Sequence, residues 1–331
     1  MPLKVTWKKG MRLTADVFDA MDACNGENLR LAILAESGGR YGLFPSSRPF
    51  ELSVNIGNNV LEVVSLSCRG ITRSGRLVDI DFDSNYTCTF DTRVAIPSGN
   101  TDEEYLLVVK LHDKEFREVG SMHSECVYSF ELLGANSPVD ADSLVVGCLV
   151  NQYGWRLNET DFVPPCLFVD AHPKFAEQLE KAKGMFKSVS DRCLGAHGCV
   201  ARFLLNSVWT AAFAEYTSLD KERGCITPGR LLSAVHKLVG AFVAGCSVDE
   251  CVTLENEAPF VEYMRMPYAA CSIYRDIAKG LGLCAEISVK MESVCAMTEA
   301  RQTVAEPPKP KSRPEPEPKA PVRNRWEGLE I

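Results

Sequence analysis

The sequence predicts an α+β protein with a β-rich, sandwich-like first part, a helical bundle and a Pro-rich tail. Short segments rich in β-branched residues recur through residues 1–168, with Gly, Asn, Asp or Pro clusters between them. Apolar residues recur at helical spacing through residues 171–300. Seven of the eighteen prolines lie between Pro307 and Pro321, and such a run cannot form a packed core. We therefore expect two folded domains and a disordered tail over residues 303–331.

The β-rich part is expected to open with a short strand over residues 4–7. Thr14 is a suitable N-cap for a helix, which Asn25-Gly26 interrupts and which residues 29–34 can continue. Six later segments alternate like strands, with the spacing of a β-sandwich or a barrel. They are residues 51–55, 60–66, 76–81, 105–111, 127–132 and 143–150.

The helical part begins with an apolar stripe in which steps of four and three residues alternate. Two interpretations fit this pattern: the helix packs on the core of its own chain, or it lies at an oligomer axis. An apolar stripe needs a partner, and in the second interpretation that partner is another copy of the chain. The stripe consists of Phe175, Leu179, Ala182, Phe186 and Val189.

Three more helices are expected in the helical part. One covers residues 200–216, and another starts with Thr227 as N-cap and Pro228 at the first helical position. The last covers residues 266–279. Residues 281–300 combine strand-like and helical features and receive no assignment.

Composition limits the classes of function. The net charge of −8 over 331 residues argues against nonspecific binding to DNA or anionic membranes, because no basic face is evident before the tail. The fourteen cysteines are irregularly spaced, and the first residues do not have the pattern of a signal peptide. We expect buried, reduced cysteines in a cytoplasmic protein. No apolar run approaches the length that spans a bilayer.

The sequence contains no phosphate-binding loop, nucleophile elbow or zinc-protease motif. Asp79–Asp83 imitates half of a calcium loop, but its alternation favours the charged face of a strand. Cys193, His197 and Cys199 are potential zinc ligands without a fourth at a standard spacing, and a tight loop between helices is the alternative. His236 lies in an apolar helix, where packing is expected. We therefore expect no catalytic, cofactor-binding or metal-binding residue, and no enzyme.

The tail combines a basic tether with an apolar tip. Six basic and two acidic residues lie between Lys309 and Arg325. Roughly twenty residues of extended polyproline chain, at ~3.1 Å each, reach about 60 Å. An apolar tip on a tether is typical of a docking motif, and a solubilising tail with an incidental tip is the alternative. The expected docking residues are Arg323, Arg325, Trp326, Leu329 and Ile331.

A series of short motifs follows in order between residues 4 and 280. It comprises Trp7, Gly10, Met11, Leu13 and Phe18, then Tyr41-Gly42-Leu43, Leu61–Val63, Leu66–Val78, Thr227–Gly240, Pro259–Tyr263 and Ala270–Ile277. Together these motifs resemble the TssK family of type VI secretion baseplate subunits. The chain departs from the family where Ala15-Asp16-Val17 replaces Pro-Gln-His and where Thr227 replaces a His before Pro228. Family members generally continue into a C-terminal head, whereas the Pro-rich tail follows here.

The resemblance implies a β-rich shoulder domain similar to that of siphophage receptor-binding proteins, a helical neck, and three chains around one axis. It makes the apolar stripe from Phe175 to Val189 the expected trimer neck. It implies a structural adaptor that links the baseplate wedge to the membrane complex. The expected partners are other copies of the chain, wedge proteins and a membrane-complex component, with no nucleic acid and no membrane insertion. A phage or contractile-tail receptor-binding protein is the alternative, and a cytoplasmic enzyme is a more remote one. The expected shoulder interface or core residues are Trp7, Gly10, Met11, Leu13, Phe18, Tyr41, Gly42 and Leu43.

Overall fold

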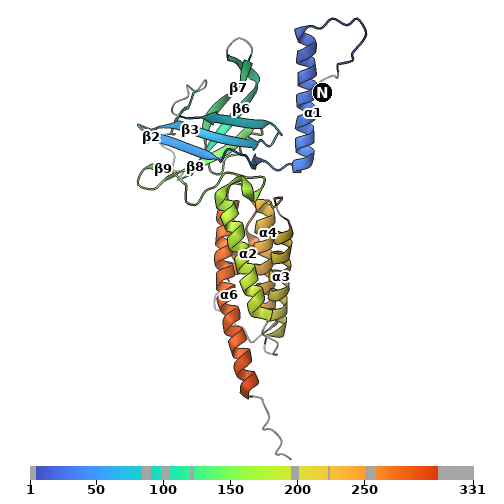
Figure 1. Cartoon of the computed structure of the whole chain (residues 1–331). Coiled ribbons are helices and arrows are strands. Elements are labelled where there is room, and N and C mark those ends of the chain that lie inside the picture. Colours follow the sequence, from blue (N-terminus) through green and yellow to red (C-terminus); the bar gives the residue numbers. More distant parts are fainter. Residues whose placement is uncertain are drawn as a thin grey trace, which may run out of the picture.

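A computed structural model describes residues 5–83, 91–97, 104–119, 123–194, 201–222, 224–249 and 258–304. The chain is elongated, with two β-sheets at one end and a bundle of helices at the other (Figure 1). The predicted α+β class is therefore confirmed.

The five expected docking residues of the tail, and the potential zinc ligands His197 and Cys199, lie outside the described residues.

The shoulder contains two antiparallel sheets. In the described residues, the five-stranded sheet contains β1 (Gly42–Leu43), β2 (Glu51–Gly57), β3 (Val60–Ile71), β4 (Leu77–Phe82) and β5 (Arg93–Ala95). The four-stranded sheet has the order β7-β6-β8-β9, with β6 (Glu104–Val119), β7 (His123–Gly134), β8 (Ser143–Asn151) and β9 (Trp155–Leu157). All six alternating segments are strands, so those predictions are confirmed. The missed strands β1, β5 and β9 have two or three residues, too few to show a period.

The two sheets pack face to face, which makes the shoulder a sandwich. Leu61 and Leu66 of β3 share one core with Leu107 of β6 and Leu144 of β8. Strand β8 is buried along nearly its whole length, because residues such as Phe162 cover its other face. The predicted strand over residues 4–7 is wrong for the described residues 5–7, which pair with no strand.

The helices are α1 (Ala15–Ser37), η1 (Val169–Ala171), α2 (Pro173–Leu194), α3 (Arg202–Lys221), α4 (Pro228–Val248), α5 (Ala258–Arg265) and α6 (Ile273–Val304). Helix α1 runs straight through Asn25-Gly26, where an interruption was predicted, because one internal glycine costs only about 1 kcal/mol. It ends at Gly38, which has a left-handed backbone with a φ of 60°.

The predicted helix over residues 266–279 is confirmed for residues 273–279, which open α6, and is wrong for residues 266–272. Pro267 and a turn at residues 270–272 separate α5 from α6. The unassigned residues 281–300 all belong to α6. Their buried side chains recur at helical spacing and join the core of the bundle. These side chains are Leu283, Cys284, Ile287, Met291 and Val294.

Helices α2, α3, α4 and α6 form the neck. Helix α3 packs against α2 and α4, and α6 packs against the same two helices, so α3 and α6 are diagonal neighbours. The predicted start of α4 is confirmed, because Thr227 Oγ1 accepts a hydrogen bond from the Arg230 backbone N–H at 3.1 Å and Pro228 follows it.

By length and composition alone, α4 is the one helix among the described residues that could cross a membrane. The sequence-based expectation that no apolar run is long enough to span a bilayer is therefore wrong when length and composition alone are considered. The core helix of a water-soluble bundle passes the same test. In this chain α4 packs between α3 and α6 and buries Leu231, Val235, Leu238 and Phe242.

Candidate interaction surfaces

The opening segment lies on the surface of the chain. The exposed fraction is 53% for Trp7, 63% for Leu13 and 44% for Phe18, and Met11 is also exposed. Gly10, with a φ of 82°, forms a turn between the segment and α1. Trp7 and Phe18 were expected to be buried because they are large and apolar, and for the single chain this expectation is wrong. The reason is that α1 stands beside the sheets (Figure 1), and Ser37 is the one buried residue among those of α1.

Helix α1 is anchored through its second half. The Arg30 side chain donates a 2.8 Å hydrogen bond to the carbonyl oxygen of Ser74 and forms an ion pair with Glu27. Leu34 lies against Gly75, where a Cβ atom would come within 2.7 Å of the leucine side chain. These contacts fix the end of α1 that leads into the shoulder.

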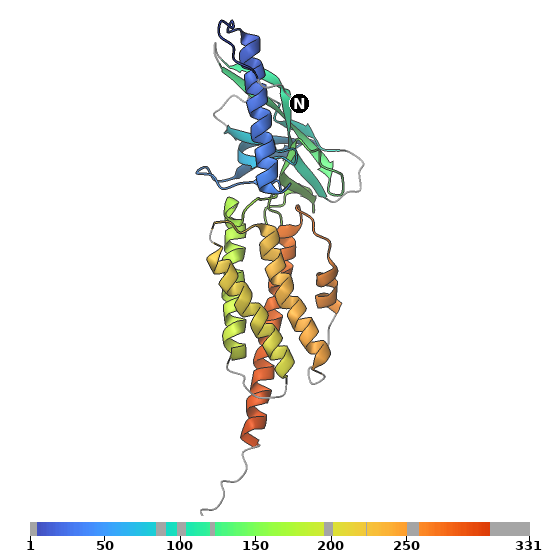
Figure 2. The same cartoon turned by 90° about the vertical axis from the view of Figure 1, so that its right-hand side faces the viewer.

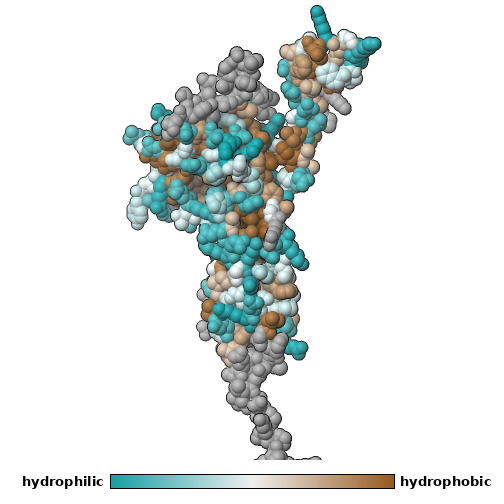
Figure 3. Space-filling model, in the orientation of Figure 1, coloured by the Kyte–Doolittle hydropathy of each residue, from teal (hydrophilic) through white to brown (hydrophobic). Residues whose placement is uncertain are grey.

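The rest of α1 carries exposed apolar side chains. Leu29 and Leu31 are exposed as well as Phe18, and the space-filling view shows apolar surface on α1 (Figure 3). An isolated helix is marginal in water, and exposed large apolar side chains on such a helix are candidates for contact with another molecule. The opening segment and α1 therefore form one candidate interaction surface.

Residues 41–43 lie where the shoulder meets the neck. The Leu43 backbone N–H donates to the carbonyl of Pro165 at 2.8 Å, and the Leu167 N–H donates to the carbonyl of Leu43 at 2.7 Å. The Val169 N–H then bonds the carbonyl of Ile226, just before α4, at 2.9 Å. Leu43 is buried. This continuous series of backbone hydrogen bonds joins the two parts of the chain.

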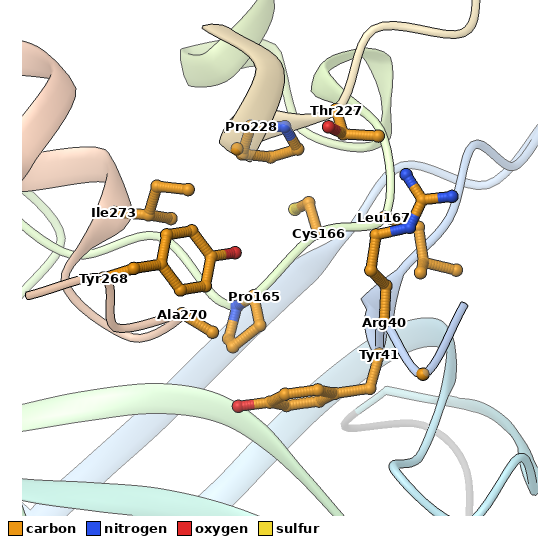
Figure 4. A pocket seen from close by; sticks show the side chains of 12 residues that line it. Arg40, Tyr41, Pro165, Cys166, Leu167, Thr227, Pro228, Tyr268, Ala270 and Ile273 are labelled. Atoms are coloured by element: carbon orange, nitrogen blue, oxygen red, sulfur yellow. The ribbon is translucent and has the colours of Figure 1, made fainter. Parts of the chain in front are cut away.

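A cavity of about 160 Å³ lies at this junction (Figure 4). The guanidinium of Arg73 lies 4.5 Å from the Tyr41 ring centre and donates to its hydroxyl at 2.8 Å. Arg40 Nε donates to the carbonyl of Ser37 at 2.7 Å. The Tyr41 hydroxyl and the Arg40 Nε group of the cavity lining therefore already have hydrogen-bond partners within the fold. The lining includes Arg40, Tyr41, Cys166, Thr227, Tyr268 and Ile273.

The apolar stripe of α2 is part of the neck core. Phe175, Ala182, Phe186 and Val189 are fully buried, and Leu179 nearly so. The Phe175 ring packs edge-on against Tyr274 of α6, with ring centres 5.5 Å apart. The expectation that this stripe faces a trimer axis is wrong, because helices of the same chain already cover it. Of the two interpretations, packing on its own core is correct.

An ion-pair network joins α3 to α4. The carboxylate of Glu215, which is 5% exposed, pairs with Arg230 at 2.6 Å and with Lys237 at 2.7 Å. Burial raises the pKa of Glu215, but the hydrogen bonds from Lys237 and Arg230 outweigh burial and lower it overall. The network neutralises the buried Glu215 carboxylate, and this is a structural role.

Several cysteine and histidine side chains of the described residues lie in packed surroundings. Burial raises the pKa of the Cys68, Cys148 and Cys284 thiols to about 12, so they stay protonated at neutral pH and are poor nucleophiles. Burial lowers the pKa of His172 to about 4, and His236 packs edge-on against a tyrosine ring. No group of three His, Cys, Asp or Glu side chains in this part of the chain could hold a metal ion.

The acidic strand β4 has the predicted role. Its exposed carboxylates pair with arginines across the sheet surface. Arg48 contacts both Asp79 and Asp81, and Arg69 lies 3.2 Å from Asp79. These residues form the charged outer face of an alternating strand.

Comparisons with known proteins agree with this architecture. A crystal structure of TssK matches 87% of the chain and 69% of its own, with a TM-score of 0.56 and 14% identity. A chain of the TssK-TssF-TssG baseplate subcomplex of a type VI secretion system matches 88% of this chain and 99% of its own, also with a TM-score of 0.56 and 14% identity. TssK from the EAEC type VI secretion system, in complex with a nanobody, matches 81% and 96%, with a TM-score of 0.53 and 16% identity. No family profile and no curated protein matches the sequence. The chain therefore has a TssK-like fold.

Proposed function

We propose that this chain is a structural subunit of a type VI secretion baseplate and that it catalyses no reaction. The observation that carries the proposal is the TssK-like fold, which extends through both the shoulder and the neck. In the proposed assembly, three copies form a cytoplasmic adaptor that links the baseplate wedge to the membrane complex. The continuous backbone hydrogen bonds at residues 41–43 support a mechanical role, because they couple the shoulder to the neck.

The proposal is tested by reconstitution. The full chain is expected to co-purify with the TssF and TssG proteins of the same organism, since these proteins accompany the TssK-like fold in the baseplate subcomplex. Affinity capture followed by light scattering measures both the complex and its mass. Failure to form any complex at micromolar concentrations would contradict the proposed function.

We place the wedge contact on the opening segment and α1. Replacing Trp7 by alanine is expected to weaken binding to TssF and TssG at least tenfold, because an exposed Trp that becomes buried in an interface contributes about 2 kcal/mol or more. The thermal unfolding temperature should stay within about 2 °C of the parent, since Trp7 is 53% exposed in the single chain.

Tyr153 provides the matched control. It is a fully exposed aromatic residue outside α1, so Tyr153→Ala should bind as the parent does. Trp7→Ala with parental affinity would remove Trp7 from the interface. Trp7→Ala that unfolds early would instead assign Trp7 to the shoulder core.

We also propose that the tip of the tail binds a further component of the machine. Deleting residues 305–331 should leave the number of chains in the oligomer and the binding to TssF and TssG unchanged, while secretion falls to background. Trp326→Ala in the full chain should reproduce the loss, because Trp is a frequent anchor in small interfaces. Normal secretion by both variants would show that the tip is no docking motif.

A further inference from the structure

We propose that another cavity, between the β-strands of the shoulder and the start of α2, binds a small apolar carboxylic acid in its ionised form. This cavity has a volume of about 190 Å³ and is lined by residues of β2, β8 and β9 and of the chain that leads into α2. Figure 2 shows the shoulder above the neck, with the helices of the neck ending at the base of the sheets. The inference goes beyond the proposed function, because a small acid can bind without any baseplate protein.

Most of the cavity wall is apolar. A dry cavity of about 150 Å³ in another protein is large enough to bind benzene, so this cavity can hold a six-membered ring or a branched chain of similar size. An ordered water needs two to four polar partners, and the apolar wall provides none of them. The apolar lining consists of Phe50, Leu52, Val146, Leu157, Phe162 and Pro164.

His172 brings one buried hydrogen-bond donor to the cavity. It is 9% exposed, and its Nδ1 accepts a hydrogen bond from the Lys174 backbone N–H at 3.3 Å. The ring is neutral at neutral pH, because burial lowers its pKa to about 4. A neutral imidazole has one donor and one acceptor nitrogen, so Nε2 carries the proton. No described residue accepts a hydrogen bond from Nε2, which leaves this donor available to a ligand.

A positive charge lies beside this donor. Lys174 lines the same cavity, and its ammonium group is close enough to the imidazole to contribute to the low pKa of His172. Its Nζ atom contacts the backbone carbonyl of Glu159, and an ammonium group has three donors. The Glu159 side chain is exposed, and Lys174 forms no ion pair with any described residue.

These two groups select the chemistry of the ligand. A carboxylate can accept the hydrogen bond from His172 Nε2 and form an ion pair with the ammonium group of Lys174. A neutral ligand can use only the hydrogen bond, and a cationic ligand is repelled by the ammonium group. The apolar wall takes the rest of the ligand. The expected class is therefore a small monocarboxylate with an aromatic or branched apolar body.

A bound acid would contact both parts of the chain. Phe50 and Leu157 belong to the shoulder, whereas His172 and Lys174 lead into the neck. Binding to the folded chain alone stabilises it by mass action. An acid in this cavity should therefore stabilise the junction between shoulder and neck.

The test uses benzoate as the probe, with the full chain at neutral pH. In a ligand-observed NMR titration, benzoate should bind saturably, with a Kd on the order of 1 mM or tighter for a ligand of this size. Benzyl alcohol has the same ring without the charge and should bind at least about tenfold more weakly. A saturating concentration of benzoate should also raise the thermal unfolding temperature.

Two variants remove the polar groups one at a time. His172→Phe keeps a ring but removes the Nε2 donor, and Lys174→Met removes the ammonium group but keeps an unbranched apolar chain. Each should weaken benzoate binding about tenfold, and Lys174→Met should leave the binding of benzyl alcohol unchanged. Lys187→Met is the matched control, because Lys187 is an exposed lysine of α2 outside the cavity, so it should bind benzoate as the parent does.

Circular dichroism should show parental helix content for the variants, and Lys174→Met keeps the test valid if His172→Phe unfolds. Three results would overturn the inference. They are the absence of saturable benzoate binding, equal affinity for benzoate and benzyl alcohol, and parental benzoate affinity in Lys174→Met. Since none of these measurements involves TssF or TssG, the inference can fail while the proposed function stands, and the reverse.

Discussion

Replacing Gly42 with alanine is expected to destabilise the folded chain by about 3 kcal/mol or more. Gly42 has a φ of 129°, a conformation that residues with a side chain rarely adopt. A Cβ atom at this position would lie 2.2 Å from the backbone oxygen of Pro165, which cannot move aside as a flexible side chain would. Relief of this overlap must separate Leu43 from residues 165–167 and so break the hydrogen bonds that join shoulder and neck.

Denaturant unfolding of the purified chain measures this effect. Gly57, in β2, is the control, because no atom lies within 4 Å of the position of its Cβ and its φ is not positive. Gly57→Ala should unfold within about 0.5 kcal/mol of the parent. If Gly42→Ala were as stable as the parent, the close approach of residues 42 and 165 would not exist in solution.

The sequence revealed those parts of the fold in which a local pattern has one physical solution. Strand β4 alternates buried and exposed residues, and the structure places Asp79 and Asp81 outward as predicted. Thr227-Pro228 starts α4 because a hydroxyl cap and a missing N–H suit only a helix N-terminus. The three-residue strands could not be predicted, since they depend on pairing with β3 or β8 and not on a local period.

The candidate surfaces were harder to predict, because one pattern has two solutions. The stripe from Phe175 to Val189 has the same spacing whether α3 and α6 cover it or another chain does. Trp7 and Phe18 are apolar in either a core or an interface, and their exposure appears only once α1 is placed.

Replacing Phe186 by alanine is expected to destabilise the chain by about 3–5 kcal/mol, because a fully buried ring is lost and its cavity can close only in part. The neighbouring Lys187 is exposed, so Lys187→Ala should change stability by less than about 0.5 kcal/mol. Chemical denaturation followed by circular dichroism measures both variants.

The mass of Phe186→Ala under native conditions distinguishes the two origins of the α2 stripe. Because Phe186 lies in the core of its own chain, the folded variant should keep the oligomeric state of the parent while its denaturation midpoint falls. A stripe at an oligomer axis would give the opposite result, with dissociation into stable monomers and little loss of monomer stability. That opposite result would contradict the packing of α2 against α3 and α6. It would show instead that Phe175, Phe186 and Val189 lie in an interface between chains.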